Sequence, residues 1–271
     1  MNRPHPTLAQ LHGVWRRTFV READGSTDRS TIATWLQGPS LFADLRQPPG
    51  LAETVARSYL HDLDRPQLLA LCEQRAFAGA LVEGDDAFSW IRRIDLHPPA
   101  PLPDAGTLHW EGSVLVEEGL HEAYVEHWER VAQSPLTPAS ALLEDPQEGC
   151  TGVLVRAGSW FGYARDRSVP LGTSSVALVD QVLGCRTRAE AAALLDCEVS
   201  IGVIRADDRW EIVRSTLPHR VGAQLAPRLN RAGDGLEIGD ADRRGRPRTR
   251  GWQLTQTQGP VSLLALGPAG G

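Results

Sequence analysis

The stretch His12-Gly13-Val14-Trp15-Arg16-Arg17-Thr18-Phe19-Val20 decides the fold. Its alternate residues Trp15, Arg17 and Phe19 share one face, and a period of two is typical of a β-strand. Asp24-Gly25 follows this stretch and is a strong signal for a hairpin. The chain is therefore expected to open with an antiparallel strand.

More strands of this kind follow along the first half. Stretches bounded by turn residues and rich in β-branched and aromatic residues predict strands at 31–37, 40–46, 77–83, 88–96 and 107–116. Between the second and the third of these, Asp64 and Pro66 indicate the start of a helix, and an apolar stripe continues it to about Arg75. The first half is thus a mainly β unit with one short helix.

A second half repeats this order. Residues 124–131 resemble the opening strand, 151–156 and 160–166 the next two, and 187–195 form a helix with a Thr-x-x-Glu capping box. The matched pairs Trp15/Trp128, Gly79/Gly202 and Trp90/Trp210 differ in residue number by 113, 123 and 120. Trp110 and Trp252 differ by 142, which predicts an insertion at about 227–250. We therefore predict an internal duplication that gives two tandem antiparallel β-barrels, 1–118 and 119–271.

Composition narrows the class of protein. The 271 residues carry a net charge of −6, whereas nucleic-acid binding favours a basic excess. No apolar run reaches the roughly 18 residues of a membrane helix. The four cysteines form no C-x-x-C pair, and no signal-peptide core precedes them, so free thiols in a reducing cytoplasm are expected. Five arginines between 243 and 250 are flanked by acidic residues, which favours a solvated loop. Neither nucleic acid nor a membrane is expected as a partner.

Gly13 and Trp15 on a first strand, followed by hairpin-rich β structure, resemble the calycin superfamily of lipocalin-like barrels. The resemblance implies that the tryptophan closes one end of the barrel and that an arginine from a late strand lies across its ring. Arg92 or Arg93 is expected to do this for Trp15, and Arg214 for Trp128. It also implies a ligand cavity, because calycins carry small apolar molecules, although closed barrels can equally be filled.

A barrel cavity of this kind needs apolar walls and a few orienting polar groups. The predicted walls are Trp35, Phe42, Trp90 and Trp160. The predicted polar contacts are Arg46, Arg92 and Tyr124. The expected ligand is small and largely apolar or aromatic.

Two constellations are candidates for catalysis. His109 and Glu111 share one face of a strand and suit general acid/base chemistry, but an outward polar face is the simpler interpretation. Asp44 and Arg46 also share a face and bind a ligand carboxylate or form a structural ion pair. His121 and His127 are too far apart on a strand to hold one metal ion. No metal or cofactor is therefore predicted, with haem on a single histidine as a minor alternative.

Three functions remain open at this stage. The first is a binding protein for a small apolar or aromatic ligand. The second is a cofactor-free isomerase, hydratase or lyase that uses the same cavity. The third is a scaffold with a filled core that binds a protein partner. The sequence does not indicate an oligomeric state.

Overall fold

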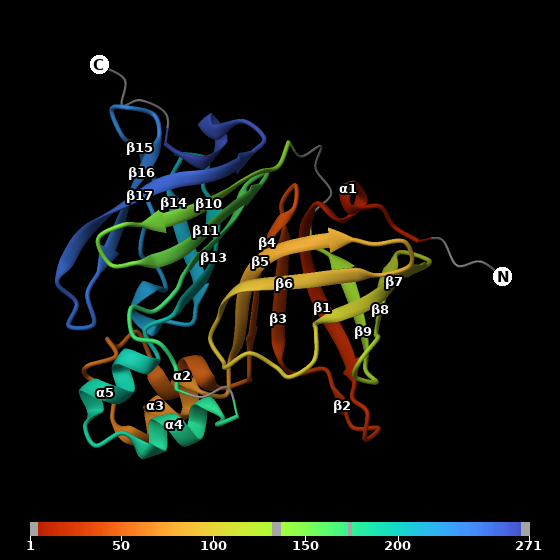
Figure 1. The fold of residues 1–271 in the computed structure, drawn as a ribbon, viewed down its shortest axis with the longest axis horizontal. Coiled ribbons are helices and arrows are strands. Elements are labelled where there is room, and N and C mark those ends of the chain that lie inside the picture. The colour runs from red at the N-terminus through yellow and green to blue at the C-terminus, as the bar shows by residue number, and fades with distance from the viewer. Residues whose placement is uncertain (1–4, 132–136, 173–174, 267–271) are drawn as a thin grey trace.

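The computed structural model describes residues 5–131, 137–172 and 175–266. The first part of the chain forms a closed antiparallel barrel of eight strands (Figure 1). Each strand pairs with the next, and the last pairs back onto the first. The strands are β1 (Gly13–Arg21), β3 (Ile32–Gln37), β4 (Leu41–Gln47), β5 (Arg75–Glu83), β6 (Phe88–Asp95), β7 (Ala105–Glu111), β8 (Val114–Gly119) and β9 (Val125–Arg130). A short β2 (Thr27–Asp28) extends the hairpin from β1.

The rest of the chain forms a second antiparallel sheet that curls into a half-barrel. Its strand order is β14-β13-β12-β11-β10-β17-β16-β15. The strands are β10 (Ala139–Asp145), β11 (Cys150–Ala157), β12 (Trp160–Arg165), β13 (Glu198–Ile204), β14 (Trp210–Ser215), β15 (Arg228–Leu229), β16 (Gly235–Ala241) and β17 (Pro247–Gln258). The mainly β class is confirmed. This second sheet stays open because β14 and β15, at its two edges, do not pair.

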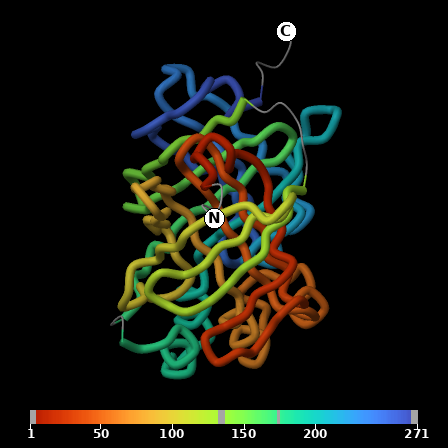
Figure 2. Tube along the Cα trace, turned by 90° about the vertical axis from the view of Figure 1, so that its right-hand side faces the viewer, coloured from red at the N-terminus to blue at the C-terminus, as the bar shows by residue number. Residues whose placement is uncertain are grey.

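The strand predicted to open the second half closes the first barrel instead. β9 pairs with both β8 and β1, and Arg17 lies opposite Trp128. Figure 2, seen from the barrel side, shows the red N-terminal strand and the yellow-green strands in one body. The match of Trp15 with Trp128 is therefore wrong, because an alternating pattern identifies a strand but not its partner. The sheets change between Arg130 and Ala139, whereas the predicted boundary at 118/119 falls at the end of β8.

The element order nevertheless repeats between the sheets. Two strands, two helices and two strands occur as β3-β4-α2-α3-β5-β6 and again as β11-β12-α4-α5-β13-β14. Gly79 and Gly202 lie at the corresponding register shifts of β5 and β13. β17, which carries Trp252, pairs with β10 as β9 pairs with β1, so β17 corresponds to β9. The segment 227–250, predicted as an insertion, contains β15, β16 and the start of β17.

Besides β2 and the strands β15 and β16 of the segment 227–250, the strands β8 and β10 were not predicted as separate elements. The predicted single strand 107–116 is the hairpin of β7 and β8, because Gly112 turns the chain with φ +62°. β10 was not predicted, since its Ala, Leu and Glu residues favour a helix and only its tertiary contacts make it a strand.

Four short helices lie together at one end of the molecule (Figure 1). They are α2 (Leu51–Val55), α3 (Arg65–Leu71), α4 (Leu178–Gly184) and α5 (Arg188–Leu194). The expected caps are present, since Asp64 caps α3 and Thr187 caps α5, each in a capping box. Helix α1 (Leu8–Leu11) precedes β1, and two 3-10 turns, η1 (Pro218–Arg220) and η2 (Val261–Leu264), complete the described elements. No helix in the described ranges is both long and apolar enough to span a membrane.

The apolar core has three parts. One fills the closed barrel, and one lies within the second sheet. The third is shared, because Leu36 and Ala43 of the barrel pack with Val155 and Ile201 of the second sheet and with the helices. The sheets are thus joined by one continuous apolar layer. All four cysteines are free, and Cys72, Cys150 and Cys197 are buried.

Candidate functional site

Aromatic side chains fill the interior of the closed barrel. The ring of Trp35 lies 6.0 Å from that of Trp15, 5.8 Å from Trp128 and 6.1 Å from Trp90. Phe42 is fully buried in the same cluster. Trp35 and Phe42, predicted as cavity walls, are therefore packing residues of the core. Trp160 lies in the second sheet, against the shared core, and does not join them.

Trp15, near the start of β1, is fully buried at one end of the barrel. Its indole nitrogen donates to the carbonyl of Leu11 at 2.7 Å, and an arginine lies 4.2 Å above its ring. This arginine is Arg130 of β9, which also donates to the carbonyl of His12, so the expectation for Arg92 or Arg93 is wrong. The expectation for Arg214 is also wrong, because Arg214 joins the two sheets by a bond to Gln47.

The opposite end of the barrel interior is polar. Arg46 donates to Asp44 at 2.9 Å and to Glu126 at 2.7 Å. Arg17 of β1 pairs with the same oxygen of Glu126. Burial raises the pKa of the Asp44 carboxyl, although Arg46 opposes this effect. The predicted pair of Asp44 and Arg46 is thus part of a buried charge cluster.

Glu117 of β8 is the carboxyl in this cluster that has no arginine bonded to it. It accepts hydrogen bonds from the Tyr124 hydroxyl at 2.7 Å and the Trp128 indole at 3.1 Å. Burial, reinforced by the charge of Glu126, raises the pKa of Glu117 to about 8. Burial and Glu117 also raise the pKa of Tyr124, which keeps its phenol as the donor. A carboxyl poised near neutral pH in a pocket is a marker of functional sites.

A small pocket of about 80 Å³ opens at this end, and we name it the inner pocket. Five carboxylates and three arginines line it, together with three aromatic rings: Glu22, Asp104, Glu117, Glu122, Glu126, Arg46, Arg75, Arg92, Phe77, Trp90 and Tyr124. Four predicted ligand contacts, Arg46, Trp90, Arg92 and Tyr124, therefore meet here. Their surroundings are more acidic than the apolar cavity expected from the sequence.

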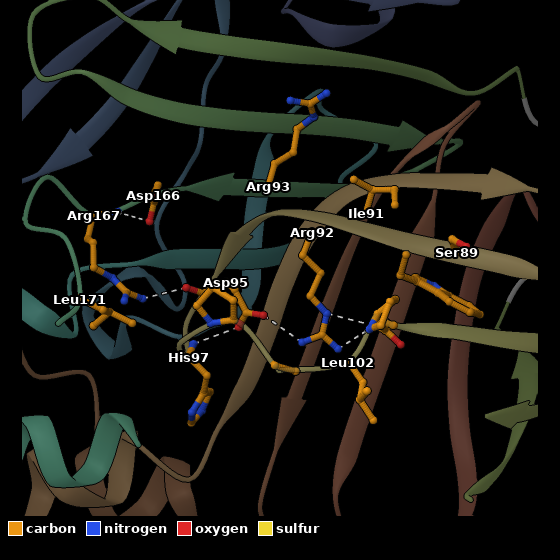
Figure 3. Close-up of a pocket in the computed structure, with 15 residues that line it drawn as sticks. Ser89, Ile91, Arg92, Arg93, Asp95, His97, Leu102, Asp166, Arg167 and Leu171 are labelled. Atoms are coloured by element: carbon orange, nitrogen blue, oxygen red, sulfur yellow. Dashed lines mark hydrogen bonds and ion pairs between the residues drawn. The ribbon is translucent and has the colours of Figure 1, made fainter. Parts of the chain in front are cut away.

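A larger cavity of about 480 Å³ lies outside the barrel wall, and we name it the outer groove (Figure 3). Its lining comes from β6 (89–93 and 95), from the connection to β7 (97, 99, 100 and 102–104) and from the segment after β12 (166, 167 and 171). It exists because β6 and β7 separate. They pair only at Phe88 and Ser89, and the connection carries prolines, which cannot donate to a strand ladder.

Arg92 separates the two cavities. It pairs with Asp104 at 2.7 Å and with Asp95 at 2.8 Å, and its guanidinium lies 3.7 Å from the centre of the Phe77 ring. Burial opposes its charge, but Asp104 and Asp95 outweigh that effect and raise the pKa of Arg92. Figure 3 shows Arg92 and Arg93 on opposite sides of β6. Because Trp90, Arg92 and Asp104 line both cavities, they form the wall between groove and pocket.

His109 and Glu111 lie apart from this site. Their neighbour Leu108 points into the barrel core, so these two side chains point to the outer face of β7. They lie 3.5 Å from each other and line neither the inner pocket nor the outer groove. Their position corresponds to the outward polar face, which was the simpler interpretation of the sequence.

The second sheet has a buried charge network of its own. Arg220 donates to Glu198 at 2.9 Å, and Arg250 pairs with Asp145 and Asp240. Arg250 ends the arginine-rich segment predicted as a solvated loop, but it is buried. Among the described residues, no group of three or more His, Cys, Asp or Glu side chains is placed to hold a metal ion.

The sequence analysis missed Arg17, Glu117 and Glu126 as members of the site. Each lies two positions from a residue of the barrel core, namely Trp15, Leu115 and Trp128. In a strand, such neighbours point to the same side. The alternation therefore contained the signal, but β8 was not recognised as a separate strand and β9 was assigned to the wrong sheet.

Comparisons with known proteins bear on the fold alone. No family model matches the chain, and a search of curated proteins gives no significant match. Among solved structures, the chain is similar to the uncharacterized protein YLR301w from Saccharomyces cerevisiae. The TM-score is 0.53 at 10% sequence identity, and the match covers 90% of this chain and 98% of the yeast chain.

Proposed function

We propose that the protein binds a small organic ligand at the gap between β6 and β7. The observation that carries this proposal is the 480 Å³ outer groove, which has the size of a small-molecule site. Trp35 and Phe42 pack in the filled barrel and line neither cavity, so the ligand would lie at the barrel wall, where Trp90 lines the groove, and not inside the barrel. Apolar contacts come from Ile91 and Leu102, which are about half exposed.

We also infer a distant relation to the calycins, supported by Trp15 at the closed end of the barrel and by Arg130 across its ring. A cytoplasmic location belongs to the same proposal, and the four free cysteines support it.

The test uses 1-anilinonaphthalene-8-sulfonate as an apolar fluorescent probe. We expect the native protein to bind it and Leu102→Glu to weaken the affinity at least fivefold, because the charge would enter the apolar side of the groove. Leu120→Glu is the matched control, since Leu120 is similarly exposed but lies outside the groove. Equal affinities of the two variants would refute the proposal. No binding at all would also refute it and favour a filled scaffold for a protein partner.

A second candidate is a cofactor-free isomerase, hydratase or lyase, and Glu117 is the observation that favours it. A carboxyl with a pKa of about 8 exchanges protons near neutral pH, which general acid/base catalysis requires. Glu117, and not His109, would be the working group. A ligand identified by native mass spectrometry should then be converted by the native protein, but only bound by Glu117→Gln.

A further inference from the structure

The charges of the buried cluster do not balance. Two arginines, Arg17 and Arg46, face three carboxyls, Asp44, Glu117 and Glu126. All five side chains are at most 15% exposed. Water therefore screens this cluster poorly, and uncompensated charge in such surroundings is costly. The cluster has one positive charge too few.

The hydrogen bonds show which carboxyl groups lack a positively charged partner. Both oxygens of Asp44 accept from Arg46, and one oxygen of Glu126 accepts from Arg17 and Arg46. The other oxygen of Glu126, Oε2, is buried and has no hydrogen-bond partner among the described residues. Glu117 accepts only from the neutral donors Tyr124 and Trp128. The deficit is thus centred on Glu117 and Glu126, which both line the inner pocket.

We propose that the inner pocket binds the ammonium group of a primary amine, held by Glu117 and by Oε2 of Glu126. An ammonium group supplies the one positive charge that the cluster lacks. It also supplies three N–H donors, which the oxygens of Glu117 and Glu126 can accept. Trp90 adds an aromatic ring to the lining, and aromatic faces attract such cations, as the Phe77 ring already attracts Arg92. The inference rests on the proposed function in one respect, namely that the remainder of the amine would extend past Arg92 into the outer groove.

Other occupants fit this pocket less well. An anion would meet five lining carboxylates and three arginines, two of which, Arg46 and Arg92, already have two carboxylate partners each. A metal ion would find no group of three or more ligating side chains among the described residues. The volume of about 80 Å³ admits only a few non-hydrogen atoms. A small ammonium head group suits the acidic lining, does not require three metal-ligating side chains and fits the volume.

Without a ligand, a proton on Glu117 takes the place of the missing charge, because its pKa is about 8. The charged or titratable groups that act on Glu117 are Glu126 of β9, Arg46 of β4, Asp104 before β7 and Tyr124, and Glu22, Arg75, Arg92 and Glu122 line the same pocket. Bound ammonium would displace this proton. Below pH 8, the affinity for the amine should therefore rise about tenfold for each unit of pH.

The experiment is calorimetric titration of the full protein with n-propylammonium chloride at pH 6, 7 and 8, with n-propanol as the neutral comparison. We expect binding of the amine alone, an affinity that rises about tenfold from pH 6 to 7, and proton release into the buffer. Glu117→Gln should lose at least ten times in affinity and most of the pH dependence. Glu144→Gln, on an exposed carboxylate of the second sheet, is the matched control.

Equal binding of propanol, or an affinity for propylammonium that is unchanged by Glu117→Gln, would overturn the inference. If Glu117→Gln does not fold, carboxyl ¹³C NMR of the native protein replaces it. Saturating propylammonium should then lower the pKa of Glu117, and an unchanged titration would overturn the inference. Propylammonium is too small to need the outer groove. A failure with the fluorescent probe alone would therefore overturn only the proposed function, and a failure with the amine alone only this inference.

Discussion

At the scale of single residues, the two ends of the barrel interior differ in charge, because one holds an aromatic ring and the other holds a buried cluster of ion pairs. Trp15 and Arg130 close one end through an indole and a guanidinium, which need no buried anion. At the other end, Arg46 lies between Asp44 and Glu126. Removing one partner of such a buried set leaves its neighbour uncompensated, which costs more than the pair contributes when it is intact. These side chains therefore form a unit, and only Glu117 can change its charge without breaking an ion pair.

The first prediction follows from the pKa of Glu117. In the folded protein this pKa is about 8, compared with 4.5 for an unperturbed glutamate, so between these values the folded state holds a proton that the unfolded state has released. Stability must then fall as the pH rises from about 5 to 8, with a slope on the order of 1 kcal/mol per pH unit from this group.

Glu117→Gln keeps a neutral side chain of the same shape and should remove that slope. Urea unfolding at pH 5, 6, 7 and 8 measures it. Relative to the native protein, the variant should gain stability steadily with increasing pH. A constant difference between the two proteins would show that Glu117 ionises normally.

At the scale of elements, two glycines fix the bends of equivalent strands. A Cβ on Gly79 would overlap the carbonyl oxygen of Ile91, and one on Gly202 would overlap the ring of Phe161. Both glycines lie where the register shifts, in β5 and in β13. Such bulges bend a strand and require a close approach of backbones.

Gly79→Ala and Gly202→Ala should each therefore destabilise the protein by about 1–3 kcal/mol, as overpacking does. Gly251→Ala on β17 is the control, because a Cβ there meets nothing within 4 Å. It should leave stability unchanged to within ~0.5 kcal/mol. Chemical denaturation measures all three variants. A loss at Gly251 equal to that at Gly79 would mean that steric overlap of the Cβ does not govern these sites, because the lower backbone entropy of the unfolded chain would stabilise an alanine variant.

Local signals in the sequence were sufficient to predict most strands and helices, but not to predict which strands pair with each other. The strand from Gly13 and the caps Asp64 and Thr187 depend on neighbours in the chain, and these predictions agree with the structure. The closure of the barrel by β9 depends on hydrogen bonds between β1 and β9, more than 100 residues apart. Four residues that line the inner pocket were predicted as site residues, whereas the wall formed by Arg92 depends on the separation of β6 from β7, which no local pattern specifies.

At the scale of the whole molecule, the two sheets share a core. Leu36 of β3 is fully buried among residues of the second sheet and the helices. Arg214 of β14 donates to Gln47 at 3.0 Å and to Thr34 at 2.7 Å, across the same interface. Separating the sheets would expose this apolar layer to water, at roughly 25 cal/mol for each Å². Each sheet therefore has an apolar cluster of its own, but the stability of both also depends on the shared layer.

We expect the two sheets to unfold in one cooperative transition. Tryptophan fluorescence reports mainly on the barrel, which holds five of the eight tryptophans, and peptide-resolved labelling of the buried Cys150 thiol reports on the second sheet. The two signals should give one urea midpoint. Leu36→Ala should lower the free energy of unfolding by the ~2–5 kcal/mol that a buried Leu→Ala change costs, and should therefore lower both midpoints together. Val82→Ala, at an exposed position, should lower neither midpoint. Loss of the Cys150 protection at a lower urea concentration than the fluorescence change would mean that the barrel is stable alone, and that the shared layer is an interface between two separately folded domains.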